Sequence, residues 1–258
     1  MSDTVPDEGE HEGECSLVFQ GVAVNAGRDC ATARYLAIGA VIAMAIARSI
    51  GLAEAATHEE TSVVALPAAH HDGTVALEKA FFARRSVREF HAAALGLAEV
   101  GQLLWAAQGD TRGGHRTAPS AGALYPLEAY VVASRVDGLA PGVYRYESAA
   151  HRLIRTAAGN RGGDLARAAY GQDWLREAAA ILVLTAVERR TTAKYGQRGV
   201  RYVSMEAGHA AQNVLLQAVA LGIGATPVGA FDDAQVDHML GLDAGEHALY
   251  LIPVGRPR

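Results

Sequence analysis

Cysteine is almost absent from this sequence. Only Cys15 and Cys30 occur, and both lie near the N-terminus. The rest of the chain therefore has no disulfide framework, no thiolate nucleophile and no cysteine metal site. If the protein carries out redox chemistry, a bound cofactor must supply it.

A basic excess is absent as well. The chain has 23 Lys and Arg against 28 Asp and Glu, which gives a net charge of -5 and a pI of about 6.1. Nucleic-acid-binding surfaces usually carry a strong basic excess, so the composition argues against a nucleic-acid partner. His58, His70 and His71 lack the helical two-histidine spacing of a zinc site, and we expect no metal.

The apolar run over residues 35–47 is too short to span a bilayer, because a spanning helix needs about 20 residues. Residues 34–56 nevertheless have features of a secretory signal: Arg34 precedes the run, and Ala53-Glu54-Ala55 has the small-x-small form of a cleavage site. An alanine-rich helix packed on the protein fits the same run. A cytoplasmic protein and an exported or membrane-associated one therefore both stay open.

The composition divides the chain into four parts. Residues 1–33 are rich in Asp, Glu and Gly and predict a disordered acidic tail, which the apolar segment 34–56 follows. Residues 57–73 contain Pro67 and two adjacent histidines and predict a linker. Half of the composition is apolar, which is sufficient for a sizeable core. We therefore expect one folded domain over residues 74–258.

Periodic apolar residues predict the elements of this domain. Spacings of three and four predict helices over residues 75–81, 96–108 and 199–221. Short apolar runs predict strands over residues 127–133, 181–187 and 248–254. Because strands mix with helices without a regular β-α-β rhythm, the pattern favours an α+β sandwich.

A dense basic block follows the first predicted helix: Arg84, Arg85, Ser86 and Arg88. A planar guanidinium can donate two charge-assisted hydrogen bonds at once, so three of them with a hydroxyl suit a dianionic phosphate. Cations just past a helix also offset the negative end of its dipole and can form a solvated cap. The residues alone leave both interpretations open.

Two glycine-containing segments differ in what they indicate. Pro119, Ser120, Ala121 and Gly122 have small side chains that would let backbone lie against a flat ring, although Pro and Gly also fit an ordinary turn. Gly222-Ile223-Gly224 follows a predicted helix rather than a strand. It therefore does not have the context of a dinucleotide-binding fingerprint.

Lys194 and Tyr195 precede the longest predicted helix, on an expected loop. Such a pair is ordinarily a surface feature, but a lysine desolvated near other cations loses its proton more readily and can act as a base. On the helix itself, Gln212 and Asn213 are typical of amides that bond to neighbouring backbone, and we expect His209 to be structural or interfacial.

Together, these blocks resemble the nitroreductase-like flavoproteins, which hold FMN. The Lys194-Tyr195 pair, followed by Arg201-Tyr202 and Glu206 to Asn213, is similar to the SagB-type dehydrogenase branch of that family, also called azoline oxidases. The resemblance implies a mixed sheet flanked by helices, with a long central dimer helix. It also implies a homodimer with one FMN per subunit, bound near the interface by residues of both chains.

The resemblance further implies which residues contact FMN. The arginine block would bind the phosphate and ribityl chain, and the other segments would lie along the ring. The implied contacts are Arg84, Arg85, Ser86, Arg88, Pro119, Ser120, Ala121, Gly122, Leu124, Gln212, Pro227, Val228, Gly229 and Arg256.

The implied reaction is a two-electron dehydrogenation, as when an azoline ring of a peptide becomes an azole. The flavin takes a hydride while Lys194 and Tyr195 serve as acid and base. An NAD(P)H-dependent reductase of nitroaromatics or quinones is the alternative, and it needs no base. A non-catalytic flavin-binding module is the alternative from another class.

Overall fold

The computed structural model describes residues 18–19, 22–23 and 62–258, and the chain divides into two units, Met1–Glu60 and Thr61–Arg258. In the first unit, β1 (Val18–Phe19) and β2 (Val22–Ala23) pair antiparallel within the tail predicted to be disordered. Their valine and phenylalanine residues favour strands. The rest of that tail and the segment 34–56 lie outside the described residues.

The second unit is built on a seven-stranded sheet in which all neighbouring strands pair antiparallel. A parallel pair, β4 (Leu95–Gly96) and β6 (Val136–Asp137), forms a separate small sheet. The predicted α+β fold is confirmed, with an antiparallel main sheet in place of the mixed one. The order of the main sheet is β10 (Gly224–Ala225), β11 (His247–Gly255), β9 (Ala180–Ala186), β5 (Leu127–Ala133), β7 (Gly142–Glu147), β8 (Arg152–Ala158) and β3 (Val63–Ala65).

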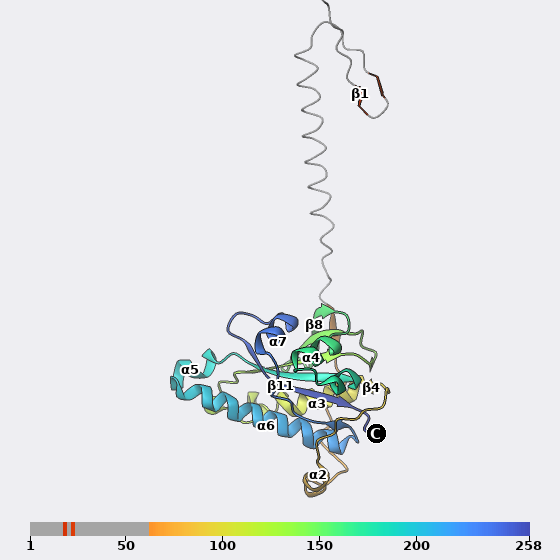
Figure 1. The fold of residues 1–258 in the computed structure, drawn as a ribbon. Helices are drawn as coiled ribbons and strands as arrows, with labels where there is room; N and C mark the ends of the chain where they lie inside the picture. Colours follow the sequence, from red (N-terminus) through yellow and green to blue (C-terminus); the bar gives the residue numbers. More distant parts are fainter. Residues whose placement is uncertain (1–17, 20–21, 24–61) are drawn as a thin grey trace, which may run out of the picture. The chain divides into compact units, whose positions relative to one another are not determined.

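Helices cover both faces of this sheet (Figure 1). One face packs against α3 (Leu97–Gln108) and the 23-residue α6 (Arg198–Ala220). The other packs against α4 (Gly162–Ala168), the 3-10 helix η3 (Asp173–Glu177) and α7 (Asp233–Leu240). The remaining helical elements are α2 (Leu77–Ala83), α5 (Arg189–Tyr195) and the 3-10 turns η1 (Arg112–Gly114) and η2 (Ala121–Ala123).

The strongly periodic segments are those that the sequence predicts closely. The helices predicted over 96–108 and 199–221 correspond to α3 and α6, and the three predicted strands correspond to β5, β9 and β11. The short helix predicted over 75–81 is α2, of which only Ala80 is buried. Within the described part of the chain, no helix combines the length and the apolar character needed to cross a membrane.

Residues 62–66 are part of the fold and not of the predicted linker. β3 adds an edge strand to the sheet by pairing with β8. Leu66, directly after β3, is only 8% exposed and belongs to the core under α3. The contribution of a three-residue strand depends on a partner about 90 residues further along, so local composition does not indicate it.

The chain beyond β3 is fastened to α3. The side-chain oxygen of Gln102 accepts from the His70 N–H at 2.8 Å, and its amide nitrogen donates to the His70 carbonyl at 3.0 Å. The ring of His71 stacks on Trp105 with 5.2 Å between ring centres. The folded domain therefore includes residues 62–71, instead of beginning near residue 74.

We expect Leu66→Ala to lower the free energy of unfolding by about 2–3 kcal/mol, because truncating a buried leucine loses apolar burial and leaves a cavity. Val63→Ala, on β3, is the control: Val63 is 53% exposed, so the change should stay within about 0.5 kcal/mol. Urea unfolding measures both. Small and equal losses would contradict the assignment of this segment to the core.

Candidate functional site

The candidate catalytic pair ends a helix and does not lie on the expected loop. Lys194 and Tyr195 are the last residues of α5, which stops where Gly196 adopts a φ of 56°. The Nζ of Lys194 lies 5.4 Å from the centre of the Tyr195 ring. That ring packs edge-on against Tyr202 of α6, with 5.3 Å between centres. The pair is thus held at a turn between two helices.

Gly122, far away in the sequence, packs against this pair. Its φ is +64°, in the left-handed region that favours glycine. A Cβ at this position would lie 2.8 Å from Tyr195 Oη and 3.0 Å from Lys194 Nζ. A side chain at residue 122 would therefore displace both groups. The segment predicted to approach a ring and the predicted acid/base pair meet at this glycine.

A buried carboxylate ties the same segment to α6. The N–H of Ala121 donates to Glu206 Oε1 at 2.7 Å, and Glu206 is only 4% exposed. Ser120 Oγ accepts from the Tyr125 N–H at 2.8 Å. Burial raises the pKa of Glu206, and the hydrogen bond from Ala121, with the nearby Ser120 and His209 side chains, offsets only part of that rise.

Glu206 belongs to the motif, but sequence reasoning gave it no role of its own. The sequence does contain a signal for one: Glu206 lies on the buried side of α6 with Val203 and Ala210, where a charge without a partner would be costly. Asn213 donates to the Thr117 carbonyl at 3.3 Å and so ties helix to backbone, as its structural interpretation predicts.

The arginine block lies at the other end of α6. The Val87 N–H donates to the Ala225 carbonyl at 3.1 Å, just after the helix. A Cβ on Gly224 would lie 2.7 Å from Val87 Cγ1, so this glycine lets the two segments pack closely. The backbone of the block is therefore fixed to the edge strand of the sheet.

The side chains of the block are available to an anion. Arg85, Ser86 and Arg88 are exposed and Arg84 is half-buried. Within residues 62–258, none of the three arginines forms an ion pair. The Arg88 guanidinium lies 5.7 Å from the centre of the Trp174 ring, which restricts its direction.

Three other predicted contacts lie along the same edge of the sheet. The backbones of Val228 and Leu251 exchange hydrogen bonds of 2.8 and 2.9 Å, so Pro227, Val228 and Gly229 continue the line of β10. At strand spacing, the four steps from residue 225 to residue 229 span about 13 Å. The phosphate candidates and this loop can therefore face one elongated ligand.

Arg256 also lies beside the block, because the His91 N–H donates to its carbonyl at 2.8 Å. Unlike the arginines of the block, it pairs with a carboxylate of its own chain, Glu99, at 2.8 Å. Two of the predicted contacts have less specific surroundings. Leu124 is half-buried directly after η2, and Gln212 is half-buried on α6 with no hydrogen bond to another described side chain.

The structure thus gathers the predicted residues into two groups and does not join them. The Gly122 group contains residues 119–122, Lys194 and Tyr195. The arginine group contains residues 84–88, 227–229 and Arg256. Glu206 marks the first group on α6 and Ala220 precedes the second, so roughly 21 Å of helix separates them. Figure 1 shows α5 at one end of α6 and α2 near the other.

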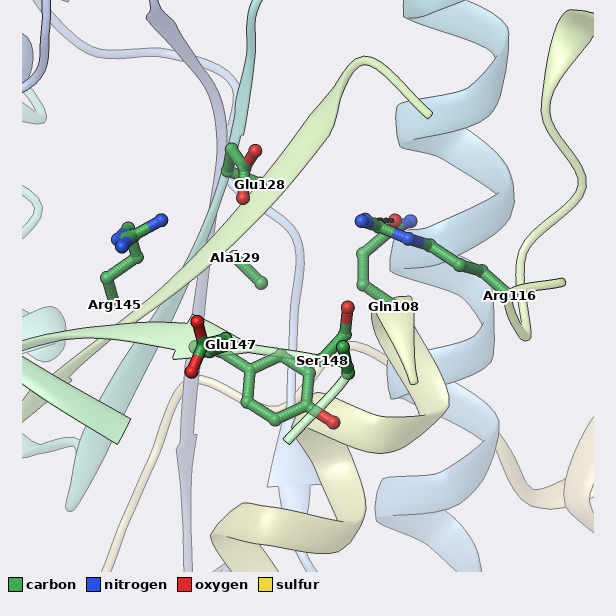
Figure 2. A pocket seen from close by; sticks show the side chains of 9 residues that line it. Gln108, Arg116, Glu128, Ala129, Arg145, Glu147 and Ser148 are labelled. Atoms are coloured by element: carbon green, nitrogen blue, oxygen red, sulfur yellow. Dashed lines mark hydrogen bonds between the residues drawn. The ribbon is translucent and has the colours of Figure 1, made fainter. Parts of the chain in front are cut away.

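Two hollows in the described domain are small. One of about 170 Å³, drawn in Figure 2, lies between the end of α3 and strands β5 and β7. Two of its charged side chains have partners within the chain: Arg116 donates to Gln108, and Glu128 pairs with Arg190. A second, of about 150 Å³, lies beside Arg85 and the end of α6. Both fall below the roughly 300 Å³ of ordinary ligand pockets.

Comparison with known sequences places these observations in a family. The model of the nitroreductase family matches residues 82–256. The chain is 45% identical over 183 residues to the Methanocaldococcus jannaschii protein "Putative nitroreductase MJ1384", covering 70% of this chain and 91% of that one.

Solved structures share the fold. A crystal structure named as a putative nitroreductase, from Anabaena variabilis, is similar with a TM-score of 0.68 and 29% identity, over 78% of this chain. This chain spans 42% of the length of that protein. The Escherichia coli microcin synthetase McbBCD complex, bound to truncated pro-MccB17, contains a chain with a TM-score of 0.60 and 24% identity. The alignment covers 78% of this chain and 79% of that one, and the likeness is one of fold alone.

We expect Gly122→Ala to displace Lys194 and Tyr195, because the new methyl group would occupy the space next to their terminal atoms. Gly113→Ala is the matched control: its φ of +73° imposes the same left-handed strain, but its nearest neighbour lies 3.8 Å away. Both should lose about 1 kcal/mol of stability. NMR of the Tyr195 ring should change only in the Gly122 variant; an unchanged ring signal would contradict the contact.

Proposed function

The chain belongs to the nitroreductase family of oxidoreductases, and from that premise we propose that FMN is its cofactor and that two copies of the chain complete each flavin site. The dehydrogenase chemistry of the SagB-type branch is the reaction we propose for it. The observation that carries this proposal is the packing of Lys194 and Tyr195 against Gly122, in the segment proposed to face the ring.

The residues of the arginine group fit a flavin phosphate. Arg84, Arg85 and Arg88 supply cations without a carboxylate partner among the described residues, and Ser86 supplies a hydroxyl between them. A phosphate dianion is stabilised by several charge-assisted hydrogen bonds from such a group. Residues 227–229, about 13 Å along the edge strand, are then within reach of the other end of the cofactor.

One copy of the chain offers only half of this arrangement. About 21 Å of α6 lies between Glu206, which binds the Gly122 segment, and Ala220, which precedes the phosphate candidates. From this separation we infer that the two groups of one copy serve different flavins. Exposed apolar residues point to a second copy: Leu77, Phe81 and Phe82 on α2, and Met205 on α6. Exposed apolar groups of this kind commonly mark protein interfaces.

In the proposed reaction, FMN, when bound, supplies the two-electron acceptor. The protein supplies the proton transfer: a carbon of the azoline ring loses its proton to Lys194 Nζ, and Tyr195 Oη lies beside it to orient or relay that proton. Lys194 is one of only two lysines, with Lys79, among 23 basic residues. A lysine can give up its proton where an arginine cannot. One of the two lysines therefore lies at the position where the proposed reaction needs a base.

A reductase of nitroaromatics or quinones is the second candidate. The name of the 45% identical relative favours it, and this reaction would use the same flavin site without a base. A flavin-binding module without turnover would need the arginine group but would be indifferent to Lys194 and Tyr195.

The absorbance spectrum of the purified protein, before and after anaerobic NADPH, distinguishes these functions. The dehydrogenase should show a flavin spectrum that NADPH bleaches slowly or not at all, whereas rapid bleaching would favour the reductase. With azoline peptides, Lys194→Ala should lower the rate about 10²–10⁴-fold with the flavin retained, and Lys79→Ala should not. A protein that binds no FMN when FMN is added would contradict both enzymes.

Mixed dimers test whether the two groups come from different copies. Arg85→Ala weakens the phosphate group and Lys194→Ala removes the base, so each variant alone should be inactive or nearly so. Equal mixing after subunit exchange should restore about a quarter of the wild-type sites, because half of the dimers combine one copy of each and contain one intact site. No recovery would show that each site is built within one copy.

A further inference from the structure

We propose that Glu206 is a positioning residue, which holds residues 120–122 on α6 so that Gly122 seats the Lys194 and Tyr195 side chains. Its catalytic meaning rests on the proposed function, but the positioning itself is a property of the protein without cofactor.

The contact that carries this role is a hydrogen bond between backbone and a buried side chain. Glu206 Oε1 accepts from the Ala121 N–H at 2.7 Å, and Glu206 is only 4% exposed. The turn has a bond of its own next to this one, since Ser120 Oγ accepts from the Tyr125 N–H at 2.8 Å. The carboxylate thus holds the turn on α6 through Ala121.

The next residue along the chain transmits this position to the acid/base pair. Gly122 follows Ala121 directly, and its missing Cβ leaves the space that the ends of Lys194 and Tyr195 approach. The helix that carries Glu206 also carries Tyr202, against which Tyr195 packs at 5.3 Å. If residues 120–122 shifted away from α6, Lys194 and Tyr195 would lose their contact with Gly122. The contact of Tyr195 with Tyr202 would stay, because Tyr202 lies on α6 itself.

A carboxylate suits this task better than a neutral residue. It accepts from the Ala121 N–H through a charge-assisted hydrogen bond and brings no donor of its own into the buried site. A glutamine keeps one acceptor oxygen for this N–H but loses the charge, whereas a leucine leaves the N–H without this partner. Loss of function should accordingly be graded, with Glu206→Leu more affected than Glu206→Gln.

The first test uses the protein without FMN. In a Lys79→Arg background, Lys194 is the only lysine, so selective ¹³C-lysine labelling gives one side-chain signal. Glu206→Leu should shift that signal and speed amide hydrogen exchange in residues 117–125 at least tenfold. Glu206→Gln should change both less. Glu246→Gln is the control, because it alters another buried carboxylate, bonded to Thr185.

An unmoved Lys194 signal in folded Glu206→Leu would overturn the proposal, as would equal changes in the Glu246 control. If Glu206→Leu does not fold, Glu206→Gln decides: it must shift the Lys194 signal by more than Glu246→Gln does. These outcomes do not depend on any reaction, so they stand even if the proposed dehydrogenase chemistry fails.

The second test uses the FMN-loaded protein and the azoline oxidation rate. If Glu206 acts through Lys194, Glu206→Gln should lower the rate at least fivefold in the wild-type background and have no further effect in Lys194→Ala. Equal losses in both backgrounds would mean that Glu206 acts independently of Lys194, and would contradict the positioning role.

Discussion

The packing of α6 on the sheet is the constraint on which the rest of this molecule depends. The helix is buried along one side by Val203, Ala207, Ala210 and Val214, and it runs the length of one face of the sheet. The two ends of the helix are therefore held at a fixed distance from each other. Each end receives a different piece of chain: the turn at Gly122 and the end of α5 at one, and the arginine block at the other. The Gly122 segment is bonded to this helix, and the arginine block is bonded to the strand that follows it.

This constraint explains why the candidate residues form two groups. The arginine block and the edge strand would bind part of the proposed cofactor, which has a phosphate at one end and a flat ring at the other. The groups suited to proton transfer lie at the far end of the same helix. In the proposed dimer, a second copy would bring the two together, and the exposed apolar residues of α2 are consistent with such a partner. The proposed function would then be a property of a pair of chains.

The elements that can be predicted from the sequence are those that a local apolar pattern determines. α6, β5 and β9 can be predicted because their apolar spacing reflects burial along a continuous segment. β3 cannot be predicted in this way, since its place in the sheet depends on pairing with β8 much later in the chain. Lys194 and Tyr195 could be singled out as a pair, but their helix and their contact with Gly122 could not, because that contact joins segments remote in sequence. For the same reason, the sequence does not predict the bond between Ala121 and Glu206.

Sedimentation velocity, detected through the visible absorbance of bound flavin, most directly tests the claim that two copies of the chain build each site. If two copies build each site, flavin should sediment only with the dimer, and dilution that dissociates the dimer should release it. Flavin that sediments with a single chain of 27.0 kDa would contradict the account.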